Sequence, residues 1–194
     1  MSPRPRKVSD DEVVDAAARV MGRVGPAQLT LAEIAAEAGV TAGALVQRFG
    51  SKRELLLAVT ARAANGAADF FARLRAEHPS PVAALRAYAR CFGEMGASPA
   101  AVARSLAYLQ VDMTDPEFHR LVMGQAEATR AALRALVADA VAAGELAPAS
   151  DPETLARLIE ATLGGSLLGW AFYQSGSAPD WVARDLEALL DLAR

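Results

Sequence analysis

Between residues 41 and 53 a run of short side chains is followed by longer hydrogen-bond donors, a combination that suits contact with a nucleic acid. Gly43 and the alanines beside it let a helix backbone approach a surface closely. Gln47 and Arg48 are long enough to reach the edges of bases. Lys52 adds a positive charge, which phosphate groups attract. The chemistry indicated is recognition of bases and phosphates.

These residues belong to a pattern of two short helices joined by a tight turn. Thr30 and Glu33 form a candidate capping box at the start of the first helix. Gly39 can adopt the left-handed conformation that ends that helix. Apolar residues at helical spacing predict a shared seam, comprising Leu31, Ile34, Ala35, Val40, Leu45 and Phe49. The pattern is that of a helix-turn-helix.

The second helix would present one face to a major groove. On a helical wheel Leu45 lies in the seam, which places Gly43 and Gln47 on the opposite side. Helix N-termini and a basic N-terminal arm would contact phosphates. The candidate DNA-binding residues are Arg6, Lys7, Thr30, Thr41, Ala42, Gly43, Ala44, Val46, Gln47, Arg48 and Lys52. An ordinary αα-hairpin of a helical bundle, with a solvated charged face, is the alternative.

The whole chain has the composition and periodicity of a folded, all-α protein. A hydrophobic content of 53% with a net charge of −3 excludes disorder, and alternating β-branched runs are absent. Nine helices are predicted, at about 9–24, 30–38, 41–49, 51–77, 80–95, 98–111, 115–143, 150–174 and 178–193. Four capping boxes mark helix starts: Ser9 with Glu12, Thr30 with Glu33, Ser51 with Glu54, and Ser150 with Glu153. A small N-terminal unit would pass into a larger body through the long helix 51–77.

Catalytic, metal and membrane sites are not expected. The sequence around Ser166 lacks the second glycine of a nucleophile elbow, and His78 and His119 have no partners at metal-ligand spacing, so neither an enzyme nor a cofactor is predicted. The longest uncharged stretch, 161–173, is shorter than the roughly 18 residues that span a bilayer. With no signal peptide and a single cysteine, Cys91, we expect a cytoplasmic protein.

The N-terminal pattern resembles the DNA-binding domain of the TetR family of bacterial transcriptional regulators, over about residues 9–60. The residues that carry the resemblance are Leu31, Ile34, Ala35, Ala38, Gly39, Val40, Thr41, Gly43, Leu45, Phe49, Ser51, Lys52, Leu55 and Leu56. It implies a helix-turn-helix DNA-binding domain at 1–55 and a helical ligand-binding and dimerisation domain at 56–194. Val46 departs from the family, where that position is usually an aromatic residue that touches a phosphate.

The resemblance also implies a pocket for a small-molecule effector in the middle helices. Aromatic, thioether and amide side chains are the candidates to line it, namely Phe70, Tyr88, Phe92, Met95, Tyr108, Gln110, Met113, Phe118, Met123 and Gln125. For any one of these residues, a place in the ordinary hydrophobic core is the alternative.

The last two helices are candidates for a dimer interface. Gly165 and Gly169 lie four residues apart and would let another helix come close, within the chain or from a second copy. In the TetR family such helices pair with their symmetry mates. The predicted interface residues are Leu158, Gly165, Leu168, Gly169, Trp181, Leu186 and Leu189.

The sequence therefore favours a homodimeric repressor that binds a palindromic double-stranded DNA operator through residues 41–48 and releases it on binding a small molecule. The long helix 51–77 would couple the two domains. A helical homodimer that acts through protein partners, with weak or no DNA binding, is the competing hypothesis, because Val46 and the Ala-Gly-Ala patch offer few polar contacts. A helical enzyme would require turnover of a ligand held in the body.

Overall fold

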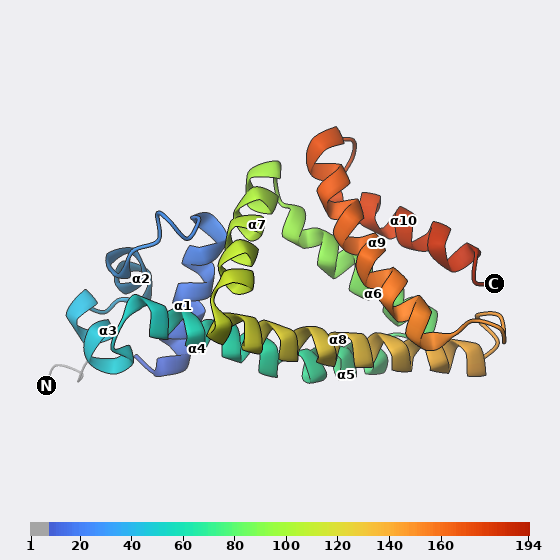
Figure 1. Ribbon diagram of the computed structural model, residues 1–194, viewed down its shortest axis with the longest axis horizontal. Coiled ribbons are helices and arrows are strands. Elements are labelled where there is room, and N and C mark those ends of the chain that lie inside the picture. Colours follow the sequence, from blue (N-terminus) through green and yellow to red (C-terminus); the bar gives the residue numbers. More distant parts are fainter. Residues whose placement is uncertain (1–7) are drawn as a thin grey trace, which may run out of the picture. The chain divides into compact units, whose positions relative to one another are not determined.

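The computed structural model describes residues 8–194, and this part of the chain is entirely helical apart from its connections, as predicted (Figure 1). It contains ten α-helices and one short 3-10 helix, which are α1 (Asp10–Arg23), α2 (Leu31–Ala38), α3 (Ala42–Phe49), α4 (Lys52–Asn65), α5 (Ala67–Glu77), α6 (Pro81–Gly93), η1 (Glu94–Gly96), α7 (Pro99–Thr114), α8 (Pro116–Ala142), α9 (Pro152–Tyr173) and α10 (Ala178–Asp191).

Local capping interactions account for several helix starts. The Ser9 hydroxyl accepts a hydrogen bond from the Glu12 amide, and the Glu12 carboxylate accepts one from the Ser9 amide, at 3.1 and 2.7 Å. The predicted box at Ser150 is wrong. Asp151 caps α9 through the Thr154 amide at 2.9 Å, because Pro152 occupies the first helical position and makes its neighbour the cap.

The segment predicted as one long helix, 51–77, is two helices. α4 ends at Asn65 and α5 begins at Ala67, with Gly66 between them in a turn that has no side-chain cap. Glycine weakens a helix interior by about 1 kcal/mol relative to alanine, which explains a break at this position. A continuous helix through 51–77 is therefore excluded as the coupling element.

Contacts divide the chain into two compact units. The first comprises the described residues up to Ala64 together with Arg104–Val122. Its core gathers residues from α1 to α4, including Val13, Ile34, Leu45 and Leu55, and Phe118 of α8 packs against the same core. In Figure 1 the helices α1, α2 and α3 group around the beginning of α4. The functional border predicted at residues 55 and 56 stays a prediction.

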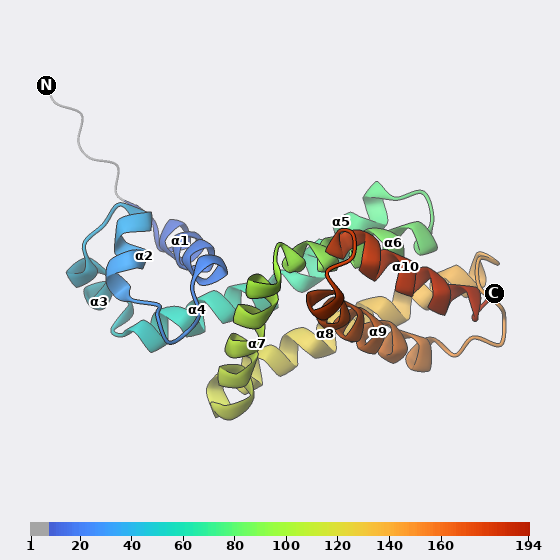
Figure 2. The ribbon, with the colours of Figure 1, turned by 90° about the horizontal axis from the view of Figure 1, so that it is seen from above.

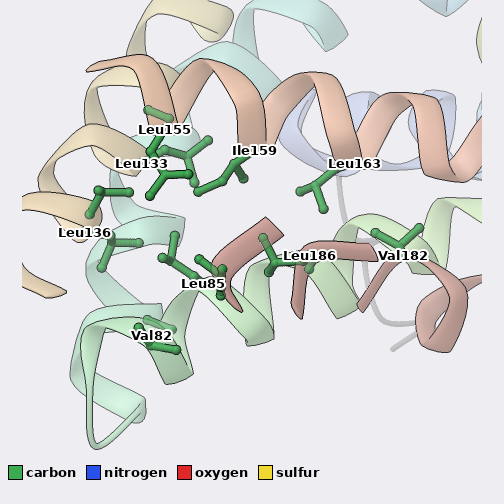
Figure 3. Close-up of a cluster of buried hydrophobic side chains, with 14 of the residues drawn as sticks. Val82, Leu85, Leu133, Leu136, Leu155, Ile159, Leu163, Val182 and Leu186 are labelled. Carbon is green, nitrogen blue, oxygen red and sulfur yellow. The ribbon is translucent and has the colours of Figure 1, made fainter. Parts of the chain in front are cut away.

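The second unit comprises Asn65–Ala103 and Met123–Arg194. Leu85 of α6, Ile159 of α9 and Leu186 of α10 are fully buried and converge in its core (Figure 3). α10 lies against α6 and α9 (Figure 2). The close packing of α6 against α10 needs glycine at position 93, because a Cβ on Gly93 would lie 2.5 Å from Cα of Pro179.

Candidate nucleic-acid interface

The turn between α2 and α3 has the geometry that the sequence predicts. Gly39 ends α2 in the left-handed conformation, with φ 68°, which is inexpensive only for a residue without a side chain. The amide of Val40 then donates to the carbonyl oxygen of Ala35 at 2.9 Å. Thr41 begins α3, since its hydroxyl accepts a hydrogen bond from the Ala44 amide at 3.1 Å. Leu45 is fully buried beneath the turn and fixes the rotation of α3.

This rotation leaves one face of α3 open. Thr41, Gly43 and Gln47 are exposed, and Val46 exposes 47% of its surface. A Cβ built on Gly43 would meet only the Thr41 hydroxyl, at 3.9 Å, so no other group covers this point. Two other candidates, Ala42 and Ala44, are half-buried. The exposed face therefore has small side chains at its N-terminal end and one long amide side chain, that of Gln47.

Arg48 does not share this open face. Its Nε donates to Oδ1 of Asp10 in α1 at 2.7 Å, and the guanidinium lies 5.8 Å from the centre of the Phe49 ring. The contact joins residues 38 positions apart in the chain, so local spacing gives no sign of it. In this conformation Arg48 braces α3 against α1.

Lys52 also turns inward. Its ammonium donates to the carbonyl oxygens of Leu29 and Pro26, at 2.7 and 3.3 Å. Both carbonyls belong to the loop that precedes α2, so Lys52 ties the beginning of α4 to the beginning of the helix-turn-helix. Lys52 is half-buried, and its predicted contact with phosphate stays a prediction.

The remaining DNA-binding candidates are the threonine at the start of α2 and the N-terminal arm. The Thr30 hydroxyl accepts from the Glu33 amide at 3.2 Å and donates to the Glu33 carboxylate at 2.8 Å. Thr30 is exposed at the N-terminus of α2, where backbone amides can face an anion. The candidates Arg6 and Lys7 lie outside the described residues.

Among the effector candidates, the structure brings three side chains together in the second unit. Phe70, Tyr88 and Phe92 join Phe71 in a chain of ring contacts, with centroids 5.0 to 6.3 Å apart. Burial, with a smaller effect from the charge of Glu160, raises the pKa of Tyr88 to about 12. Tyr88 is thus an uncharged phenol within an aromatic cluster.

The other effector candidates do not join this cluster. Met95, Gln110, Met113 and Met123 are exposed, and Gln125 is half-buried. In the first unit, Tyr108 donates its hydroxyl to the carbonyl oxygen of Val24 at 3.0 Å. Phe118 is buried in the core of that unit, which argues against a place in a pocket wall. Sequence spacing could not show this, because the core that contains Phe118 is built from residues of the distant N-terminal segment.

The candidate interface residues divide in a similar way. Leu158 and Leu168 expose 39% and 40% of their surface on α9, and Gly165 is open beside them. Leu186 is fully buried in the core of the second unit, which argues against a role between copies. Trp181 is half-buried, stacked on Tyr173 at 5.9 Å. The last two candidates, Gly169 and Leu189, are also half-buried.

Comparison with known families decides the relationship of this chain. The model of the TetR family of bacterial regulatory proteins matches residues 13–59, and that of tetracycline-repressor-like C-terminal domains matches residues 106–186. The chain belongs to the TetR family. Its helix-turn-helix lies within the match to the family's N-terminal DNA-binding domain, and residues 106–186 correspond to the family's C-terminal domain.

Solved structures of the TetR fold resemble the chain over nearly its full length. A TetR regulator from Haloarcula marismortui has a TM-score of 0.75 at 18% identity, covering 95% of this chain and 97% of that one. A TetR regulator from Streptomyces coelicolor reaches 0.68 at 26%, covering 96% and 98%. FadR from Bacillus subtilis, solved in complex with stearoyl-CoA, reaches 0.72 at 17%, covering 96% and 100%. No protein of curated function matches the sequence significantly.

Residues 8–194 show neither a metal-binding cluster nor a membrane-spanning helix. Within them, no group of three or more His, Cys, Asp or Glu side chains is placed to hold a metal ion. No helix in the same range is long and apolar enough to cross a membrane.

Helical spacing did not indicate the acidic residues that bind three arginines of the first unit. Asp115 and Glu117 bind Arg53 at the start of α4 from more than sixty residues away. Glu37 of α2 binds both Arg19 and Arg23 of α1, each at 2.7 Å. The side-chain hydrogen bonds from those two arginines lower the pKa of Glu37.

Proposed function

We propose that this TetR-family protein is a homodimeric repressor, which binds a palindromic DNA operator through α3 and leaves it when a small-molecule effector binds. The observation that carries the proposal is the open face of α3, formed by Thr41, Gly43, Val46 and Gln47, in a chain that the TetR family matches over this helix. A short recognition helix of this kind gains specificity when two copies read two half-sites.

Each residue of the open face has a distinct task in this proposal. The Gln47 amide can both donate to and accept from an adenine edge, and Val46 can contact a thymine methyl group. Gly43 lets the helix backbone approach the groove, since nothing stands over it. The N-termini of α2 and α3, capped by Thr30 and Thr41, direct backbone amides toward phosphates.

Dimerisation would use the uncharged outer stripe of α9. Leu158, Ala161, Gly165, Leu168 and Phe172 follow one another at spacings of three and four residues, as in the seam between two paired helices. All five are exposed in the single chain, and Phe172 exposes 78% of its surface. Two copies of this face related by a two-fold axis would cover each other. The predicted interface roles of Gly169, Trp181 and Leu189 stay predictions.

The effector would have substantial apolar surface. Phe70, Tyr88 and Phe92 supply an aromatic cluster with one phenolic hydroxyl in the C-terminal unit, and ligand sites are mainly apolar with a few orienting polar groups. The FadR relative was solved with stearoyl-CoA, which is consistent with an apolar ligand in this fold. Effector binding would favour a dimer whose two recognition helices no longer match the operator.

Selection of bound sequences from a random duplex pool tests the proposal. A TetR-type repressor enriches a palindrome, and its affinity for that palindrome falls steeply as salt rises, because phosphate contacts release counterions. Recovery of no sequence above background would contradict operator binding. Small molecules can then be screened for release of the enriched duplex.

One observation favours a second function, that of a helical homodimer acting through protein partners. Arg48 and Lys52, the long cations of the predicted DNA-binding face, both bond within the protein. Under this alternative, binding to mixed-sequence DNA is weak and nearly independent of salt. The salt series therefore separates the two functions.

A further inference from the structure

The beginning of α4 is placed where it can control the recognition helix. α3 ends at Phe49 and α4 begins at Lys52, so only Gly50 and Ser51 separate them. Gly50 has φ 84° and donates its amide to the carbonyl oxygen of Val46 at 2.8 Å. The Ser51 hydroxyl accepts from the Glu54 amide at 3.1 Å. A shift of the first turn of α4 therefore reaches α3 through a short, hydrogen-bonded link.

Arg53, in that first turn, is held by the corner between α7 and α8. Its Nε donates to Oδ2 of Asp115 at 3.1 Å, and its Nη2 donates to Oδ1 and Oδ2 at 2.8 and 2.9 Å. The remaining nitrogen, Nη1, donates to Oε2 of Glu117 at 2.9 Å. Every nitrogen of the guanidinium is thus bonded to a carboxylate, in a fork that suits arginine and not lysine.

The corner is itself a fixed structure. Oδ1 of Asp115 accepts hydrogen bonds from the amides of Glu117 and Phe118, at 3.0 and 3.4 Å, so Asp115 also holds the first turn of α8. Phe118 is buried in the core of the first unit, which also contains Leu55. Its ring centre lies 5.6 Å from the Arg53 guanidinium, within the range of a cation–π contact.

We propose that Arg53 is a positioning residue for DNA binding, which ties α4 to the α7–α8 corner so that Asp115 and Glu117 control DNA affinity without touching DNA. The inference rests on the proposed function, since it names a control point for the same interface. The competing interpretation is that Arg53 contacts a phosphate itself and that the two carboxylates merely repel DNA.

The positioning and repulsion interpretations predict opposite changes in DNA affinity for a variant whose α7–α8 corner carries no charged side chains. The variant carries Asp115→Asn with Glu117→Gln; asparagine remains a good helix cap, so the start of α8 is retained. Removing two negative charges strengthens DNA binding if the corner only repels phosphates. If the corner positions α4 through Arg53, the same variant weakens binding, because the guanidinium loses its ion pairs with Asp115 and Glu117. The pair that remains, with Glu54 at 3.5 Å, lies within α4 and does not tie α4 to the corner.

Binding of a labelled mixed-sequence duplex is measured across a salt series for the wild-type protein, the corner variant, Arg53→Met, and the two combined. Arg86→Met is the matched control: Arg86 exposes 44% of its side chain, against 43% for Arg53, and binds Glu187 in the other unit. We expect about a tenfold loss of affinity for Arg53→Met and for the corner variant, and no further loss when they are combined. The salt slope stays at the wild-type value.

Hydrogen exchange of the Glu54 and Leu55 amides, which donate to the hydroxyl and the carbonyl oxygen of Ser51, gives a readout that does not depend on DNA. We expect these amides to exchange about tenfold faster in both the corner variant and Arg53→Met, and at the wild-type rate in the Arg86→Met control. Unchanged exchange in the corner variant would overturn the positioning role.

The DNA series can overturn the inference separately. A salt slope lowered by about one unit in Arg53→Met would mean that Arg53 contacts a phosphate directly, and tighter binding by the corner variant would mean that the acids only repel DNA. Either result leaves the proposed function standing. Absence of DNA binding by the wild-type protein would instead contradict the proposed function and the DNA role of Arg53 together.

Discussion

A charge placed in the outer stripe of α9 should separate the dimer. Leu168 exposes 40% of its surface in the single chain, and burying a whole leucine side chain contributes about 1.5–3 kcal/mol, so its remaining burial contributes about 1 kcal/mol. An unpaired carboxylate in its place costs at least about 1 kcal/mol more. Two-fold symmetry doubles both effects, and Leu168→Glu should weaken the dimer by about 4 kcal/mol, or about a thousandfold.

Analytical ultracentrifugation over a range of concentrations measures this change directly. Leu109→Glu is the matched control, because Leu109 exposes 42% of its surface on a different helix, α7. We expect a dimer for the wild type and for the control, and a monomer for Leu168→Glu that keeps the helical circular dichroism of the wild type. A Leu168→Glu protein that remains dimeric at the same concentrations would refute the placement of the interface on α9.

Four other predictions concern single sites. Gly39→Ala should lower the free energy of unfolding by about 1 kcal/mol in a urea titration, because alanine is strained at φ 68°. Gly93→Ala should lower it by about 1–3 kcal/mol, since the new Cβ would lie 2.5 Å from the Pro179 backbone. Gln47→Ala should change the preferred base at one position of each half-site while leaving the salt slope unchanged, as sequence selection would show. The pKa of Tyr88 is raised to about 12 because the fold favours the neutral phenol. Its contribution to stability is therefore complete below about pH 10 and is lost as the pH rises toward 12. Tyr88→Phe should remove that part of the alkaline loss of stability, as urea titrations at several pH values would show.

Local signals predicted the starts of α1 and α2 and the turn between α2 and α3 accurately. The capping boxes at Ser9 and Thr30, the left-handed Gly39 and the buried Leu45 all depend on residues a few positions apart. Such patterns can be recognised from the sequence alone. The exposed side of α3 follows from them, because burying Leu45 sets the rotation of the helix.

Contacts between distant segments could not be predicted in the same way. Arg48 and Lys52 have the composition of phosphate contacts, yet Asp10 and the carbonyl of Leu29 bind them. Helical periodicity indicates that Leu186 has an apolar environment but does not say whether the chain itself supplies it. In the fold α6 and α9 pack against α10, where Leu186 is fully buried. Gly66 shows a further limit, because glycine permits a helix break without requiring one.

Selection from a random duplex pool, followed by titration of the enriched sequence against salt, tests the central claim most directly. The account predicts a palindrome whose half-sites lie about one helical turn apart or slightly more, bound with a steep salt dependence. It also predicts that Gln47→Ala loses the preference at one base of each half-site. Enrichment of no sequence by the wild-type protein, with weak and salt-independent binding to DNA, would contradict the account.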